Sequence, residues 1–90
     1  MTTTATPYDD LQAALEFGLA DRLAKSLHVS GITTAEIAEA VDCSLRTVGN
    51  YTSGRTRPGK LVMREWAART GVPLQWLETG IFPANRPLSD

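Results

Sequence analysis

Arg46 and Asn50 are the two side chains whose types and spacing best fit a specific chemistry. They stand four residues apart in the stretch from Leu45 to about Thr52, which Val48 and Tyr51 mark as a short amphipathic helix. Residues at this spacing share one helix face, here the face opposite the apolar side chains. A guanidinium can donate two hydrogen bonds to guanine, and a carboxamide can pair in the same two-point way with adenine. The pattern therefore predicts a helix surface that reads base edges in a major groove.

Other residues on or near this helix extend the candidate contact surface. Leu45 offers an apolar surface for a thymine methyl group, and Gly49 either lets the helix sit deeper in the groove or is merely tolerated. The candidates for contacts with the phosphate backbone are Thr34, Ala35, Ser44, Thr47, Ser53, Arg55, Thr56, Arg57 and Lys60. Such contacts position a domain on DNA and do not specify a sequence. The alternative for each charged or polar residue is an ordinary solvated helix face.

The charge of the chain is distributed unevenly. The net charge is −1, but residues 1–42 carry seven acidic and two basic residues, a balance of −5. Residues 43–69 carry six basic residues and one acidic residue, a balance of +5, and residues 70–90 carry −1. A basic segment in a neutral chain is the electrostatic footprint of a nucleic-acid binder, although a solvated helix face would give the same count.

Composition argues against several other classes. Ninety residues are enough for one small domain. A single cysteine (Cys43) and a single histidine (His28) support neither a disulfide framework nor a Cys/His zinc site, so we expect no metal or cofactor. Neither an acid pair nor an activated nucleophile nor a phosphate loop is evident, so we expect no enzyme. Without a membrane-length apolar run or a signal peptide, we expect a cytoplasmic protein with no membrane partner and no small-molecule effector.

The elements that position the candidate residues are predicted to be helices throughout. Apolar periodicity and capping residues predict helices over residues 9–28, 33–41, 45–52, 60–70 and 73–79. Gly18 marks a kink or a break in the first helix, and Thr33 and Glu36 form a capping box at the start of the second. We expect a disordered tail over residues 1–7, one domain over 8–82 and a second tail over 83–90.

The stretch from Thr33 to Pro58, TTAEIAEAVDCSLRTVGNYTSGRTRP, resembles the lambda-repressor/Cro-like (XRE) helix-turn-helix family. The matching positions are Thr33, Ile37, Ala38, Ser44, Thr47, Val48, Tyr51, Gly54 and Pro58, and the segment 71–80 resembles the end of the family's fourth helix and its fifth helix. The chain departs from the family pattern at Asp42, where glycine is usual in the turn, and at Gly49, where larger polar side chains are common. It also departs at 52–53 and in a longer first helix.

The resemblance implies an all-α, five-helix DNA-binding domain with an extended first helix. It further implies a Cro-like repressor of bacteriophage type in a bacterial host cell, bound as a homodimer to a pseudo-palindromic operator on double-stranded DNA. A second, self-cleaving repressor domain is not expected in this chain. The candidates for the dimer interface are Leu11, Leu15, Trp76, Ile81 and Phe82, which could instead cap the core of a monomer. The alternatives are a single-domain phage immunity repressor and an antitoxin-type interaction module that also binds DNA.

Overall fold

The structure, a computed structural model, describes residues 17–83, and every regular element in that range is an α-helix. The helices are α2 (Leu19–Ser30), α3 (Thr34–Ala40), α4 (Leu45–Ser53), α5 (Lys60–Thr70) and α6 (Leu74–Thr79). The all-α, five-helix prediction is confirmed for this part of the chain. The bounds of the last four helices lie within a residue or two of those predicted from the sequence.

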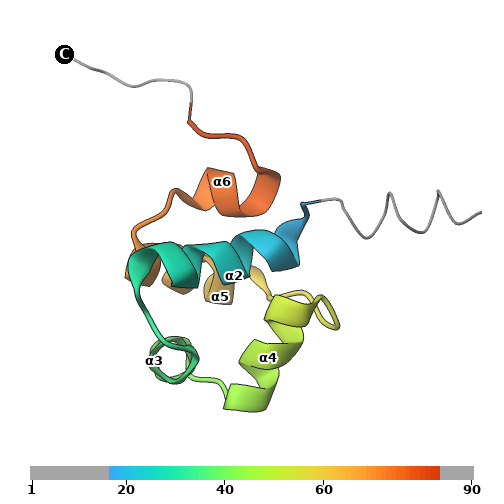
Figure 1. Ribbon diagram of the computed structural model, residues 1–90, viewed down its shortest axis with the longest axis vertical. Helices are drawn as coiled ribbons and strands as arrows, with labels where there is room; N and C mark the ends of the chain where they lie inside the picture. Colours follow the sequence, from blue (N-terminus) through green and yellow to red (C-terminus); the bar gives the residue numbers. More distant parts are fainter. Residues whose placement is uncertain (1–16, 84–90) are drawn as a thin grey trace, which may run out of the picture.

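Helix α5 lies behind α2 in the middle of the molecule, and the two helices contact each other (Figure 1). The pair α3 and α4 lies at one end of this arrangement, and α6 lies at the other. Helix α2 contacts α4, α5 and α6, while α3 is held between α4 and α5. The helix that carries Arg46 and Asn50 is therefore supported by α2 and α3, at the end of the molecule away from α6.

Short side chains determine where α3 and α4 begin. The Thr33 hydroxyl accepts a hydrogen bond from the Glu36 amide (3.1 Å), and the Glu36 carboxylate accepts one from the Thr33 amide (2.9 Å). This is the predicted capping box. The Ser44 hydroxyl accepts a hydrogen bond from the Thr47 amide (3.0 Å) and starts α4 in the same way. Caps of this kind stabilise a helix by about 1 kcal/mol, so both helices of the pair have well-defined first turns.

The connection between α3 and α4 is a tight turn through Asp42. This residue has a φ of 58° and is the one non-glycine residue in the described range with a positive φ. The next amide, that of Cys43, donates a hydrogen bond to the Ala38 carbonyl (2.9 Å) and closes the turn. Aspartate tolerates the left-handed region better than most residues, so the turn forms although the chain has aspartate where glycine is usual.

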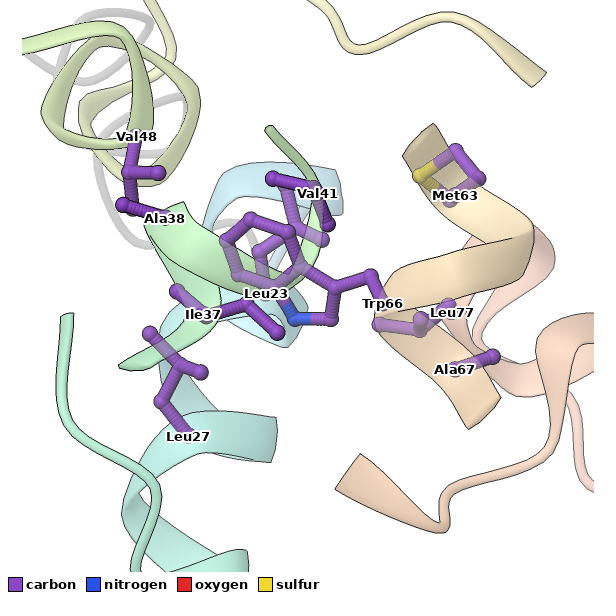
Figure 2. Close-up of a cluster of buried hydrophobic side chains, with 10 residues drawn as sticks. All are labelled: Leu23, Leu27, Ile37, Ala38, Val41, Val48, Met63, Trp66, Ala67 and Leu77. Carbon is purple, nitrogen blue, oxygen red and sulfur yellow. The ribbon is translucent and has the colours of Figure 1, made fainter. Parts of the chain in front are cut away.

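The hydrophobic core is centred on Trp66, which is fully buried (Figure 2). Leu23, Ile37 and Val41 lie around its ring, so α2 and α3 pack on the same side chain from α5. The indole nitrogen of Trp66 donates to the Ser26 hydroxyl (2.8 Å), which donates in turn to the Leu23 carbonyl (2.6 Å). Because of these two hydrogen bonds, the buried indole has no unpaired donor, as is usual for buried polar groups.

Two boundaries differ from the sequence prediction. The first predicted helix, residues 9–28, is broken at Gly18: α2 begins only at Leu19, and the Gly18 amide is bonded to the Asp21 carboxylate (3.0 Å). At its other end α2 continues to Ser30, because Gly31 adopts a left-handed φ of 75° and its amide bonds to the Leu27 carbonyl. A break was one of the two outcomes that the sequence left open for Gly18. The part of the predicted helix before residue 17 lies outside the described residues.

Candidate nucleic-acid interface

Helix α4 has one face in the core and one face in solvent. Val48 is fully buried, and the Tyr51 ring packs edge-on against Trp66 with 6.5 Å between the ring centroids. Leu45, Arg46 and Gly49 are exposed on the other side, and Asn50 is half-buried beside them. Leu45 is 58% exposed, so its apolar surface is open to a ligand. The structure thus brings the four predicted base-reading residues together on one outward surface.

Arg46 is the strongest hydrogen-bond donor on this surface. In residues 17–83 a single side-chain ion pair occurs, between Arg69 and Glu65 (3.6 Å), and it does not involve α4. No carboxylate among the described residues therefore competes at close range with a ligand for the Arg46 guanidinium. An exposed guanidinium next to a half-buried carboxamide on the same helix face is a combination that can read guanine and adenine edges.

The basic loop that follows α4 is fastened to the end of that helix. The amides of Arg55 and Thr56 both donate to the Asn50 carbonyl, at 2.9 and 3.3 Å, and Gly54 ends α4 with a φ of 86°. Pro58 is buried, whereas Arg55, Thr56 and Arg57 are exposed. The loop is therefore held in position by its backbone, and its basic side chains remain available to solvent.

This loop borders an open hollow of about 430 Å³ between the start of α2 and the end of α4. Residues 18–21 line one side of the hollow, and Tyr51 with residues 54–57 lines the other. Arg55 and Arg57 bring positive charge to it, opposed by the Asp21 carboxylate. Lys60, at the start of α5, is exposed as well. Arginine and lysine side chains grouped beside a recognition helix are suited to phosphate contacts.

The predicted phosphate contact at the start of α3 lies next to an acidic side chain. Thr34 and Ala35 are exposed, and their amides make no hydrogen bond to another described residue. The capping box, however, places the Glu36 carboxylate at the same helix end. A carboxylate there already balances the positive end of the helix dipole and repels a second anion.

The predicted hydroxyl contacts are engaged within the domain. Ser44 caps α4 and also donates to the Thr47 hydroxyl (3.0 Å), and Ser53 donates to the Asn50 carbonyl (3.3 Å). Thr47 is half-buried, while Ser44 and Ser53 are exposed. Ser44 and Thr47 therefore help to define the first turn of α4, and a contact with DNA would add to this role.

Tyr51 connects α4 to the turn before it. Partial burial raises the pKa of Tyr51 above its usual value, and the neighbouring Cys43 thiol raises it further. The phenol therefore stays neutral at physiological pH. Cys43 itself is half-buried and packs against the core.

Sequence reasoning missed Arg22, which is buried and makes no ion pair with another described residue. Its Nε donates to the Leu77 carbonyl (2.8 Å), its Nη2 to the Glu78 carbonyl (3.1 Å) and its Nη1 to the Phe17 carbonyl (3.4 Å). A cation at the end of α6 also interacts favourably with the helix dipole. Arg22 thus fastens α6 to α2. The sequence does show an arginine among the apolar residues that predict the first helix, which could have indicated a buried cation. No neighbouring residue, however, indicated its hydrogen-bond partners.

The predicted dimer candidates fall into three groups. Leu11 and Leu15 lie outside the described residues. Trp76 is half-buried and packs against the core, so much of its surface is already used within one copy of the chain. Ile81 and Phe82, just after α6, are 63% and 65% exposed. These two are the apolar side chains among the candidates that remain available for a partner at this end of the molecule.

With this geometry in place, the comparison with known families becomes informative. A helix-turn-helix family model, that of XRE/lambda-repressor-like domains, matches residues 30–77, just over half of the chain. The chain belongs to this helix-turn-helix family. The match spans α3, α4, α5 and the first part of α6, and so includes the whole candidate interface. No curated protein matches the chain.

Membership of the family establishes the general function. The domain binds DNA, and domains of this kind are typical of non-enzymatic regulators of transcription. The recognition of a lambda-repressor-like fold from the sequence is confirmed. As a separate observation, none of the helices in residues 17–83 combines the length and the apolar character needed to cross a bilayer.

Proposed function

We propose that this protein is a sequence-specific transcriptional regulator that inserts α4 into the major groove of double-stranded DNA. The observation that carries the proposal is the outward face of α4, where Leu45, Arg46, Gly49 and Asn50 are grouped while Val48 anchors the helix in the core. Arg46 reads a guanine and Asn50 an adenine, each through two hydrogen bonds. Discrimination at each such pair is worth about 1–3 kcal/mol.

The phosphate backbone is contacted on both sides of the groove. Arg55, Thr56, Arg57 and Lys60 form the principal clamp, because they are exposed and the loop that carries three of them is fastened to α4. Thr34, Ala35, Ser44, Thr47 and Ser53 make weaker contacts, given the Glu36 carboxylate and the internal hydrogen bonds of the hydroxyl groups. These contacts set the register of α4 and contribute the salt-dependent part of the affinity.

The regulator acts as a homodimer, in the manner of a Cro-like repressor that occupies a pseudo-palindromic operator and excludes RNA polymerase. One domain covers only part of a helical turn, and a two-fold dimer places its recognition helices on half-sites about 34 Å apart. Ile81 and Phe82 support an interface near the end of α6, since they are exposed and α6 lies at the end of the molecule away from α4.

Selection of binding sites from random duplex DNA, at a stated salt concentration, tests the proposal directly. We expect an enriched motif with two-fold symmetry and a guanine and an adenine at fixed positions in each half-site. Binding that shows no preference among duplexes at moderate salt would refute specific recognition.

Sedimentation of the Ile81→Ser/Phe82→Ser variant tests the proposed dimer interface. A second arm of the experiment uses the protein from which residues 1–17 are removed. A shift to monomer only in the second arm would place the interface at the N-terminal end.

A second candidate function is that of an antitoxin-type module, which binds a partner protein and regulates its own gene. The exposed Ile81 and Phe82 favour it, because they could be covered by a different protein as well as by a second copy of the chain. Co-purification of a stoichiometric partner that is released by the Ile81→Ser/Phe82→Ser variant would support this function. A homodimer that needs the same two residues would support the repressor instead.

A further inference from the structure

Gly49 differs from the other six glycines of the chain. Four of them, Gly31, Gly54, Gly71 and Gly80, end helices with a positive φ, and Gly18 and Gly59 precede the first turns of α2 and α5. Gly49 alone lies inside a helix, in the middle of α4. The structure thus explains six glycines by their positions at helix ends and leaves one that needs another explanation.

The domain itself does not require a glycine at this position. The φ of Gly49 is not positive, and a Cβ atom added there would meet no heavy atom within 4 Å outside its own helix. Alanine would therefore fit without strain, and it would favour the helical conformation more strongly than glycine does. Any benefit of the missing side chain must come from something outside the domain.

The missing side chain leaves a notch on the exposed face of α4. Residues four apart lie one above the other on a helix, and side chains lean toward the helix N-terminus. A side chain at position 49 would therefore extend toward Leu45, whose apolar surface is exposed, although a Cβ atom alone would stay more than 4 Å from it. Without it, the notch has the helix backbone as its floor and Leu45 as one wall, with Arg46 and Asn50 beside it.

We propose that this notch receives the C5-methyl group of a thymine, which makes Gly49 a specificity-determining residue. The inference rests on the proposed function, in which α4 enters the major groove. The thymine methyl is the apolar group that a base pair presents in that groove. A phosphate is a poorer occupant, because amide groups inside a helix are already bonded to carbonyls one turn earlier and Leu45 offers no donor.

The Gly49→Ala variant separates stability from recognition. We expect its midpoint of thermal unfolding to rise by about 2–8 °C, because alanine is the better helix former. At the same time, we expect its affinity for the duplex selected by the wild-type protein to fall by about 10-fold, because the added methyl occupies the notch. Affinity for an unrelated duplex should stay unchanged.

A matched control removes stability as an explanation. Ala68 is exposed on α5, outside the candidate interface, so Ala68→Gly should lower the unfolding midpoint without changing DNA binding. The double variant Gly49→Ala/Ala68→Gly should unfold near the wild-type temperature and still bind the selected duplex about 10-fold more weakly. Recovery of wild-type affinity in the double variant would contradict the proposal.

Replacing each thymine of the selected duplex by deoxyuridine identifies the methyl group directly. For the wild-type protein we expect one position per half-site at which loss of the methyl weakens binding about 3- to 10-fold. The Gly49→Ala variant should show no further loss at that position. If the wild-type protein selects a motif but tolerates deoxyuridine everywhere, or if Gly49→Ala binds as tightly as wild type, the notch is wrong and the proposed function stands. If the wild-type protein selects no motif, the proposed function itself fails.

Discussion

Helices α4 and α6 show two different ways of fastening a short helix to the same core. α4 is held by the apolar Val48, by the Tyr51 ring against Trp66 and by a serine cap, and its opposite face points outward. α6 is held by Leu77 and by Arg22, a buried cation bonded to two carbonyls at its end. The difference matters because an apolar anchor leaves the Arg46 guanidinium free for a ligand. Helix α6 instead depends on buried hydrogen bonds, and removal of any one of them would destabilise its packing.

The comparison also separates two functions in space. Helices α3 and α4 lie at one end of the molecule and α6 at the other (Figure 1). The α4 end carries the exposed Arg46 and the half-buried Asn50, and the exposed Ile81 and Phe82 directly follow α6. In the proposed function, DNA reading and association with a partner therefore use different surfaces. We expect substitutions at one end to leave the property of the other end largely intact.

The largest expected effect is on the stability of the fold and comes from the α6 end of the molecule. Arg22→Met keeps much of the side-chain volume but leaves the carbonyls of Leu77 and Glu78 without their donor. Because buried polar groups are costly when unpaired, we expect the free energy of unfolding to fall by about 2–4 kcal/mol, measured by urea denaturation. Arg64→Met, at an exposed arginine on α5, is the control and should change it little. An equal loss in both variants would show that the Arg22 hydrogen bonds contribute no more to the free energy of unfolding than an exposed arginine does.

The next effect is confined to the α4 end. We expect Arg46→Ala to lose about 1–3 kcal/mol of discrimination at one base pair per half-site, measured by competition between the selected duplex and single-base variants. Stability should be nearly unchanged, since Arg46 is exposed and makes no ion pair among the described residues. Unchanged discrimination would remove Arg46 from the reading surface and weaken the division between the two ends.

The basic loop should contribute affinity without specificity. We expect Arg57→Ala to weaken binding to all duplexes alike, because each monomer then has one cation fewer with which to neutralise the phosphate backbone. The slope of log affinity against log salt should become shallower by about one unit for every phosphate that is no longer neutralised. Titrations at several salt concentrations measure this slope, and Arg69→Ala, whose arginine pairs with Glu65, is the control. An unaltered slope would mean that the Arg57 side chain does not reach the backbone.

The smallest expected effect concerns the turn between α3 and α4. Glycine adopts a φ of 58° without the steric cost that aspartate bears there, so we expect Asp42→Gly to raise the free energy of unfolding by about 0.5–1 kcal/mol. Asp42→Ala should lower it, because alanine lacks the local hydrogen bonds that let aspartate occupy this region. Thermal unfolding of both variants tests this, and a gain in both would show that the turn is not strained in the way proposed.

Sequence analysis was most successful where neighbouring residues determine the outcome. The capping box of Thr33 and Glu36, the Ser44 cap and the inward position of Val48 follow from residues three or four positions apart. The outward grouping of Arg46 with Gly49 is the other face of the same periodicity. The sequence also places Glu36 in the cap of α3. The structure adds that this helix end is exposed, so that the Glu36 carboxylate would repel a phosphate there.

The amino-acid pattern is sufficient to define the local elements: where α3, α4 and α5 lie and which face of α4 turns outward. The reason is that caps, glycine stops and apolar spacing act over a single helical turn. Only the packed molecule reveals that Arg22 fastens the end of α6, 55 residues away, and that Trp66 is satisfied by Ser26. The same packing turns Trp76 inward and leaves Ile81 and Phe82 exposed. Interactions between residues so far apart in the chain depend on how the helices pack, and no local pattern records that packing.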